Sequence, residues 1–289
     1  MKRYAFIYNP AARNGKSNKQ LHRLKQQIDT HSHCILLKSK KKGDITQLVR
    51  QHIGDYDVFV ACGGDGTVRE IAGELLHTTK ELGIIPMGTG NDLCKTLGIP
   101  KDMDRALEIL FQQTATAIDV GKCNEFIFLN TLGLGFDGLT NKYSYNFNSL
   151  PSFLRYIVAA IRTTFTHSAF IVMSDWFDNP KKVIMLSFAN GRVEGGNFRI
   201  APEASITDQQ LDMVTIRKVR RWLIPLLLPV FYFGKASKLP QVQYQQIDKI
   251  NFTIDQPVDI HADGEIIESG ETDFTVSILS GALSVICKL

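Results

Sequence analysis

Two glycine-rich segments carry the residues of this chain best suited to chemistry. One is Gly63 to Thr67 (Gly-Gly-Asp-Gly-Thr), after the apolar run 56–62, and the other is Gly88 to Asp92 (Gly-Thr-Gly-Asn-Asp), after 83–87. Glycine lets backbone N–H groups approach a polyphosphate without interference from a Cβ atom, and a helix that begins there adds its positive end. Phosphate repels a carboxylate such as Asp65 unless a cation or a transferable proton lies between them. One such turn could equally be a tight strand-to-helix turn capped by aspartate. Two in succession favour one phosphate site with chemistry beyond binding.

A second candidate is the segment Asp263-Gly264-Glu265, which lies between two β patterns near the end of the chain. Two carboxylates on a β-turn are common, so a purely structural turn is the alternative interpretation. Phosphoryl transfer needs a group that orients and deprotonates the attacking hydroxyl. The functional hypothesis is therefore a catalytic base supplied by a second domain.

Other motifs fail on their spacing. In the segment 10–17, Gly-Lys-Ser has the spacing of a P-loop, but Pro10 stands where the motif requires its first glycine. The segment is therefore interpreted as a strand-to-helix loop. Its backbone amides, with Arg13 or Lys16, can still contact phosphate. The G-x-G-x-x-G pattern at 133–138 lacks the ribose-binding carboxylate about 20 residues later. The seven histidines form no zinc motif, and no G-x-S-x-G elbow occurs. These patterns exclude the usual nucleotide-binding folds, a zinc enzyme and a serine hydrolase.

The order of the elements predicts two domains, 1–122 and 123–289. In the first, β-branched strands, among them 34–38 and 84–86, alternate with helical patterns such as 103–112, as in a doubly wound α/β sheet. Asn9, Ser39 and the two glycine turns each follow a strand. These segments should share the edge formed by the strands' carboxyl ends. After residue 122 strands, beginning with 126–132, follow strands with one or two helical interruptions, which predicts an antiparallel β domain. Its last strand can return toward the first domain.

The composition of the chain indicates its cell compartment and the kinds of binding partner to expect. The 289 residues carry a net charge of +4 and five scattered cysteines, and the apolar run Tyr4 to Tyr8 is too short for a signal peptide, which favours a reducing cytosol. Two windows, 138–174 and 213–247, contain basic and aromatic residues but no acid. They suit an anionic membrane surface, with core helices that have basic ends as the alternative. No nucleic-acid motif accompanies the bases, so nucleic acid is not the expected partner.

Taken together, the two glycine turns, Asn9-Pro10, Ile118 to Lys122, Asn190 to Pro202 and the late Asp-Gly-Glu resemble the bacterial soluble diacylglycerol kinase family over essentially the whole chain. That family is related to sphingosine and ceramide kinases and more distantly to NAD kinases and phosphofructokinases. The resemblance implies an α/β nucleotide domain, a C-terminal β-sandwich and ATP bound in the cleft between them. The positions that match the family's ATP contacts are Asn9, Pro10, Ala11, Ala12, Arg13, Ser39, Gly63, Gly64, Asp65, Gly66, Thr67, Val68, Arg69, Thr89, Gly90, Asn91 and Asp92.

The resemblance also implies catalytic and metal-binding roles. Glu265 matches the family's proton acceptor with Asp263 beside it, and Asp65, Asp92 and Asp119 match carboxylates that organise Mg²⁺ and water near the phosphates. A second, structural Mg²⁺ maps onto Ser205, Asp208 and Gln210. Here the segment 207–212 (Thr-Asp-Gln-Gln-Leu-Asp) lacks the family's glycine, which questions the backbone geometry of that site. Arg69 replaces a common asparagine, and Gly195-Gly196-Asn197 shortens a triple glycine.

The expected activity is transfer of the γ-phosphoryl group of ATP to the hydroxyl of diacylglycerol or a similar lipid, giving phosphatidic acid, at the cytoplasmic face of the membrane. An NAD kinase-like enzyme with a soluble acceptor and a catalytically silent, ATP-dependent membrane-binding module remain the alternatives. The sequence does not identify the lipid. Edge strands in the β domain make a homodimer plausible.

Overall fold

The computed structural model describes residues 2–10, 18–41, 43–147 and 149–288. The chain divides into two compact units. Unit 1 comprises Met1–Ile118 and Gly281–Leu289, and unit 2 comprises Asp119–Ser280. The chain passes between them in β5 (Ala115–Cys123) and again in the 14-residue strand β15 (Asp273–Ile286), which therefore both belong partly to each unit.

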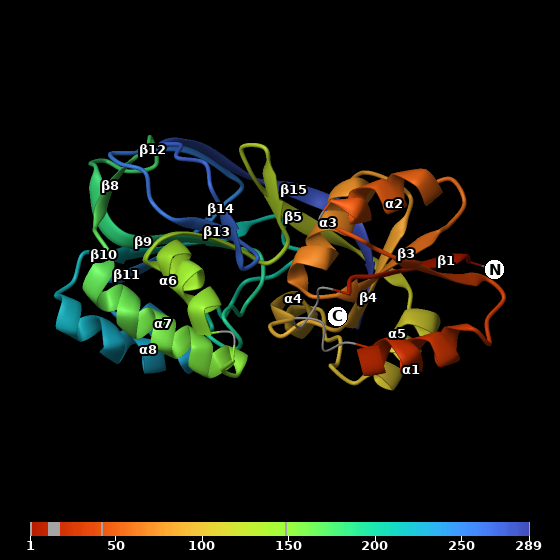
Figure 1. The fold of residues 1–289 in the computed structure, drawn as a ribbon. Helices are drawn as coiled ribbons and strands as arrows, with labels where there is room; N and C mark the ends of the chain where they lie inside the picture. Colours follow the sequence, from red (N-terminus) through yellow and green to blue (C-terminus); the bar gives the residue numbers. More distant parts are fainter. Residues whose placement is uncertain (1, 11–17, 42, 148, 289) are drawn as a thin grey trace. The chain divides into compact units, whose positions relative to one another are not determined.

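Unit 1 is a parallel sheet with helices on both faces, which confirms the predicted doubly wound α/β fold. The order β2-β1-β3-β4 is extended by the end of β15, where Ser284 and Val285 pair in parallel with β4. β1 and β3 are buried along their whole length, as expected for apolar strands covered on both sides. Figure 1 shows α2 and α3 on one side of this sheet and α1 and α5 on the other. The bounds are β1 (Tyr4–Tyr8), α1 (Asn18–Ile28), β2 (Cys34–Lys38), α2 (Asp44–His52), β3 (Val58–Gly63), α3 (Asp65–Leu75), β4 (Glu81–Pro86), α4 (Asp92–Thr96) and α5 (Met103–Gln112).

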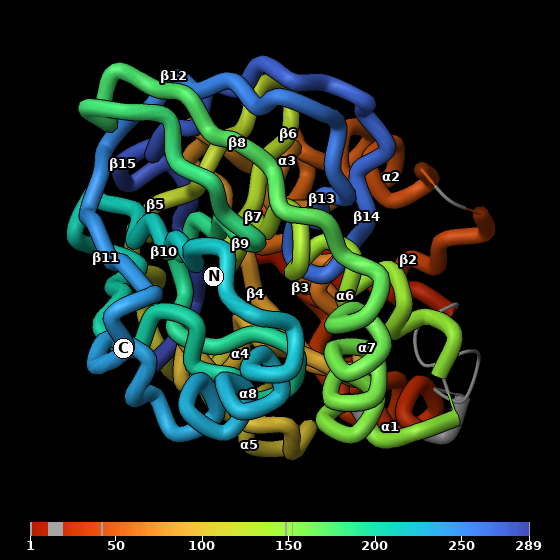
Figure 2. Tube along the Cα trace, turned by 90° about the vertical axis from the view of Figure 1, so that its left-hand side faces the viewer, coloured from red at the N-terminus to blue at the C-terminus, as the bar shows by residue number. Residues whose placement is uncertain are grey.

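Unit 2 is built on antiparallel pairs, as the sequence predicts. β9 pairs with β7, β8 and β10, and β10 also pairs with β11. β12 pairs with β8 and with the first part of β15. β13 pairs with β7 and β14. Figure 2 shows β8 and β12 running next to each other. The bounds are β6 (Phe126–Phe128), β7 (Thr131–Gly135), β8 (Phe170–Met173), β9 (Lys181–Ala189), β10 (Leu211–Arg217), β11 (Val242–Ile247), β12 (Lys249–Ile254), β13 (Ile260–Ala262) and β14 (Glu265–Ile267).

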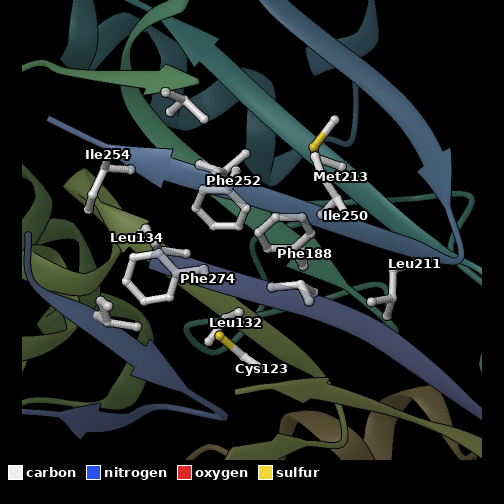
Figure 3. Close-up of a cluster of buried hydrophobic side chains, with 14 of the residues drawn as sticks. Cys123, Leu132, Leu134, Phe188, Leu211, Met213, Ile250, Phe252, Ile254 and Phe274 are labelled. Carbon is white, nitrogen blue, oxygen red and sulfur yellow. The ribbon is translucent and has the colours of Figure 1, made fainter. Parts of the chain in front are cut away.

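The main core of unit 2 consists of side chains that point inward from these strands (Figure 3). The Phe252 ring stacks on Phe188 of β9, with centroids 5.7 Å apart, and on Phe274 of β15, at 5.2 Å. Leu132, Leu134 and Met213 are buried in the same cluster. Three different strands therefore share one aromatic stack, which holds the sandwich together.

The two acid-free windows of the sequence form helices that cover one side of this sheet (Figure 1). In the described residues, the two windows and the residues just before the first of them form three α-helices rather than one or two: α6 (Phe136–Ser144), α7 (Ser152–Thr166) and α8 (Ile224–Tyr232). Short 3₁₀ turns flank them at Tyr145–Phe147, Arg221–Leu223 and Ala236–Lys238. Their inner faces form a second core with Tyr156, Phe198, Ile224 and Phe231. None of the described helices is both long enough and apolar enough to cross a bilayer.

Candidate active site

The predicted phosphate-binding segments of unit 1 meet at one edge of its sheet. Because β1 to β4 run in parallel, the residues that follow them emerge at the same end. The N–H of Asn9 donates to the carbonyl of Cys62 (3.2 Å), and the N–H of Ser39 donates to the carbonyl of Tyr8 (3.0 Å). Pro10 is described, whereas Ala11, Ala12 and Arg13 lie outside the described residues.

The two glycine turns are in direct contact with each other. A Cβ atom on Gly88 would lie 2.5 Å from the Cα of Gly64 and 2.6 Å from the Oδ1 of Asn91, so only glycine fits at this position. Asn91, at φ 50°, accepts the N–H of Gly88 (3.1 Å) and donates its amide to the Gly88 carbonyl (3.1 Å). Its own N–H donates to Oδ2 of Asp65 (2.9 Å). The two turns are thus hydrogen-bonded into one structure through Asp65.

The first turn leads directly into α3, which begins at Asp65 after the extended Gly64. The buried Thr67 accepts the side-chain amide of Asn9 (3.0 Å), and the buried Val68 anchors the helix start in the core. Gly66 and Arg69 are partly exposed, and Thr89 is exposed. Backbone N–H groups at a helix start together with a nearby hydroxyl form an anion-binding arrangement.

Two carboxylates lie around Gly90 in this turn pair. A Cβ atom on Gly90 would be 3.1 Å from Oδ2 of Asp65 and 3.6 Å from Oδ2 of Asp92. Asp92 also forms an ion pair with Lys95 at 2.6 Å. Carboxylate oxygens so close to phosphate-binding amides have the chemistry to hold a hard divalent cation.

The Asp-Gly-Glu segment of unit 2 forms the two-residue turn of a β-hairpin. Asp263 (φ 51°) and Gly264 (φ 82°) join β13 to β14, which is the left-handed geometry that an Asp-Gly pair favours. Glu265 is the first residue of β14 and is partly buried. The Asp263 carboxylate accepts the backbone N–H groups of three consecutive residues, at 2.8, 2.8 and 3.1 Å, which are Leu129, Asn130 and Thr131. The turn is therefore fixed to the start of β7, and Glu265 is held on a rigid element.

The fifth predicted carboxylate, Asp119, anchors a loop of unit 2. It is buried, and its Oδ2 accepts the N–H of Gln209 (2.7 Å). Gln209 adopts φ 65°, so a non-glycine residue takes the left-handed conformation where the family pattern has glycine. In the same loop Asp208 accepts the N–H of Gln210 (3.1 Å), and Ser205 is partly exposed. The positive backbone angle is thus retained without the glycine.

Acidic side chains gather around this loop. Burial, together with the negative charges of Asp208 and Glu203, raises the pKa of Asp212 to about 6. A bound cation would relieve this repulsion, so the donor set of oxygens fits the Mg²⁺ that the family resemblance implies here.

Comparison with known proteins agrees with this arrangement. The family model of the diacylglycerol kinase catalytic domain matches residues 3–123, and the model of the YegS C-terminal NAD kinase beta sandwich-like domain matches residues 130–287. The chain belongs to the diacylglycerol kinase family. It therefore carries the catalytic domain of an ATP-dependent lipid kinase.

Relatives and solved structures match over most of their length. A diacylglycerol kinase of Staphylococcus aureus (strain MRSA252) is 26% identical over 274 residues, which cover 91% of this chain and 86% of the relative. A diacylglycerol kinase structure from Bacillus anthracis str. Sterne has a TM-score of 0.75 at 21% identity, covering 99% of this chain and 97% of the other. A second structure from that organism has a TM-score of 0.82 at 24% identity, with the same coverage. The structural matches confirm the fold.

The sequence did not predict one buried polar group of this family member. Asp137, Glu194 and His261 come from three distant segments and are all at most 3% exposed. Asp137 lies inside the glycine pattern at 133–138, Glu194 lies in the segment 190–202, and His261 lies two residues before Asp263. Only the closeness of His261 to the Asp-Gly-Glu turn could have drawn attention to it.

Proposed function

We propose that this chain transfers the γ-phosphoryl group of ATP to the free hydroxyl of diacylglycerol, which produces ADP and phosphatidic acid. The observation that carries the proposal is the contact between the two glycine turns, joined through Asp65. Turns in contact present backbone N–H groups to a polyphosphate, and the carboxylate among them gives a reason for a cation there. The S. aureus relative is named a diacylglycerol kinase, which supports the choice of acceptor.

In this proposal the amides of Gly64, Gly66 and Gly90, with the hydroxyls of Thr67 and Thr89, position the phosphates. Glu265 takes the proton of the lipid hydroxyl, whose oxygen bonds to the γ-phosphorus as the bond to the ADP oxygen breaks. Asp263 assists by holding the turn that carries Glu265, since its carboxylate accepts three backbone N–H groups.

Mg²⁺ is the proposed metal. Asp65, Asp92 and Asp119 would hold one ion through water, and Ser205, Asp208 and Gln210 would hold a structural one. Bound Mg²⁺ supplies charge neutralisation at the transferring phosphoryl group.

The direct test is incubation of the protein with γ-labelled ATP, Mg²⁺ and separate acceptors: diacylglycerol, monoacylglycerol, a polyprenol, a sphingoid base and NAD. Label in phosphatidic acid supports the proposal, and label in another lipid changes only the acceptor. Label in NAD alone, in a lipid-free reaction, would favour a soluble acceptor. ATP-responsive liposome binding without a labelled product would instead support a silent membrane-binding module.

The structural metal gives a stability prediction. Millimolar Mg²⁺ should raise the Tm of the wild-type protein by a few degrees, because an ion that binds only the folded state stabilises it. Asp208→Asn should lose this shift, since the neutral amide binds Mg²⁺ weakly. Differential scanning fluorimetry with EDTA and Mg²⁺ measures both. Asp255→Asn, at another aspartate of unit 2, should keep the shift, and an unchanged shift in Asp208→Asn would contradict the site.

The proposed membrane contact lies on α7 and the segment 222–233. Leu154, Val158, Ile161 and Phe165 are exposed at spacings of four, three and four residues, so they form one stripe along α7. The exposed side chains Trp222, Leu226, Pro229 and Phe233 repeat this spacing. The Arg221 guanidinium donates to the Phe165 carbonyl (2.9 Å), which joins the two segments. We call these eight residues the apolar surface.

Charge complementarity favours an anionic bilayer as its partner. Arg162, Arg220, Arg221 and Lys235 lie within or beside the apolar surface and are exposed, and the two windows that form it contain no acid. Apolar side chains that enter the headgroup boundary beside basic groups bind anionic lipid in this way.

Replacing Phe165 and Trp222 with serine should weaken binding to phosphatidylglycerol vesicles about tenfold or more, since two large apolar side chains no longer enter the bilayer. Vesicle co-sedimentation measures this, and phosphatidylcholine vesicles should bind the wild type weakly. Trp176→Ser, which removes an exposed tryptophan outside the apolar surface, serves as the matched control. Equal binding of the double variant and the control would contradict the assignment.

A further inference from the structure

The turn that carries Glu265 is hydrogen-bonded to a buried histidine. The N–H of Gly264 donates to Nδ1 of His261, at 3.3 Å. His261 is fully buried in β13. A ring nitrogen that accepts a hydrogen bond carries no proton, so the proton of the neutral ring lies on Nε2.

The other ring nitrogen faces two buried carboxylates. Nε2 of His261 lies 2.9 Å from Oε1 of Glu194 and 3.4 Å from Oδ2 of Asp137. Asp137 also accepts the hydroxyls of Tyr156 (2.6 Å) and Ser187 (2.8 Å). Burial alone would raise the pKa of Asp137, but His261 and these hydroxyls outweigh it and lower that pKa, so Asp137 is ionised.

A glycine makes room for this cluster. Gly133 of β7 pairs with His261, and a Cβ atom there would collide with the Asp137 carboxylate and the His261 ring. The glycine pattern at 133–138 therefore serves close packing of polar side chains in place of dinucleotide binding.

Glu194 has the opposite tendency to Asp137. Burial and the neighbouring Asp137 charge raise the pKa of Glu194 to about 7. The other titratable groups of the cluster are Asp137 from α6, Tyr156 from α7 and His261 from β13. Glu194 and Asp137 in turn raise the pKa of His261 well above its ordinary value, against the effect of burial, so the three groups compete for the same protons. Because Nδ1 accepts the Gly264 N–H, the ring is neutral, and a second ionised carboxylate beside it would leave two negative charges in a fully buried place. A proton on Glu194 avoids this.

The three groups could instead hold a metal ion, since their ligand atoms lie within 4.8 Å of one another. A metal on Nε2 would require the ring proton on Nδ1, because a histidine ligand donates from its other nitrogen. The Gly264 N–H points at that same nitrogen. Two donors would then face each other, so the geometry disfavours a metal.

We propose that Asp137 and protonated Glu194 hold His261 in the Nε2–H tautomer, so that Nδ1 binds Gly264 and fixes the direction of Glu265. His261 is then a positioning residue, and Asp137 and Glu194 set its tautomer. This inference rests on the proposed function, in which Glu265 is the base.

Two substitutions of His261 separate positioning from general stability. Asparagine places an acceptor near the position of Nδ1, whereas glutamine reaches toward Nε2 and leaves Gly264 without a partner. The kcat of His261→Gln should fall about 10- to 100-fold with the KM for ATP unchanged, because a small displacement of the base is costly. His261→Asn should retain kcat within about threefold, since the Gly264 hydrogen bond is kept.

The matched control is the same pair of substitutions at His167, a buried histidine that bonds to the Thr163 carbonyl away from the turn. His167→Asn and His167→Gln should have equal kcat values. If the two His261 variants lose kcat equally, or lose only Tm, the positioning role is wrong.

A pH experiment tests the proton on Glu194. In the unfolded chain Glu194 ionises near 4.5, whereas in the folded chain it keeps its proton to about pH 7. Between these values the folded state binds more protons, so the free energy of unfolding of the wild type falls as pH rises through this window. In Glu194→Gln the side chain does not titrate, so the free energy of unfolding of this variant does not fall for this reason. The Tm of the variant minus that of the wild type should therefore rise from pH 5 to pH 7.5 and then level off. A difference in Tm that stays constant with pH would contradict the assignment of a proton to Glu194.

A measurement on the wild type covers the possibility that the variants do not fold. Two-dimensional ¹⁵N NMR of the histidine rings near pH 6.5, with His261 assigned as the signal absent from His261→Asn or His261→Gln, should show its Nδ1 without a proton and its Nε2 with one. A doubly protonated ring, or a proton on Nδ1, overturns the inference. Because this signal needs no turnover, it remains informative if no lipid is phosphorylated, an outcome that would count against the proposed function alone.

Discussion

Glu265→Gln should lower kcat for phosphatidic acid formation about 10³-fold, in the range found when a general base is removed. Glutamine has nearly the same shape as glutamate but cannot accept the hydroxyl proton. The KM for ATP should stay within about threefold, because phosphate binding is assigned to the glycine turns and not to this side chain. Initial rates with labelled ATP and diacylglycerol in mixed micelles measure both constants.

Two further variants make this result specific. Glu268→Gln removes a nearby exposed carboxylate and should behave as the wild type. Asp263→Asn should lower Tm as well as kcat, because the Asp263 carboxylate accepts three backbone N–H groups. If Glu265→Gln keeps near-wild-type transfer with intact ATP binding, the base is another group.

Local pattern was sufficient to predict most of unit 1. The strand Cys34–Lys38 and the helix Met103–Gln112 have the predicted bounds, because polar residues flank each apolar pattern. The strand predicted at 84–86 begins three residues earlier, at Glu81, because pairing with β3 continues through Gly83 and Leu82. The start of that strand is determined by the neighbouring strand with which it pairs, and a single sequence does not reveal that neighbour.

The strand bounds of unit 2 were harder to predict, because they depend more on contacts between segments that are distant in the sequence. The three-residue strands β13 and β14 have no alternating pattern of their own and form because Asp263 and Gly264 make a tight turn against β7. The expected strand 126–132 is divided into β6 and β7, with Leu129 and Asn130 between them bound to the Asp263 carboxylate. A turn more than a hundred residues away thus decides where these strands end.

The candidate site also has features that could be predicted from the sequence and features that could not. The glycine turns could be predicted because close backbone approach demands glycine, which is visible in the sequence. The link between them through Asp65 and Asn91, and the cluster of Asp137, Glu194 and His261, could not. They depend on which side chains the fold brings together, and carboxylates and histidines at unrelated positions leave no spacing to recognise.

Asp65→Asn should lower kcat/KM for MgATP about 10²-fold or more while leaving the fold intact, since the amide oxygen can still accept the Asn91 N–H. Metal-free ATP should show the opposite change. In EDTA the variant should bind ATP more tightly than the wild type, because the carboxylate that repels the phosphates has become neutral.

Isothermal titration with and without Mg²⁺, together with initial rates, measures both effects. Asp55→Asn, at an exposed aspartate after α2, supplies the matched change of charge and should alter neither. If Asp65 only joined the two turns by accepting the Asn91 N–H, its replacement by asparagine, whose amide oxygen can accept the same hydrogen bond, would leave turnover and both ATP affinities unchanged. Loss of MgATP turnover combined with tighter binding of metal-free ATP is therefore expected only if a cation lies between Asp65 and the phosphates.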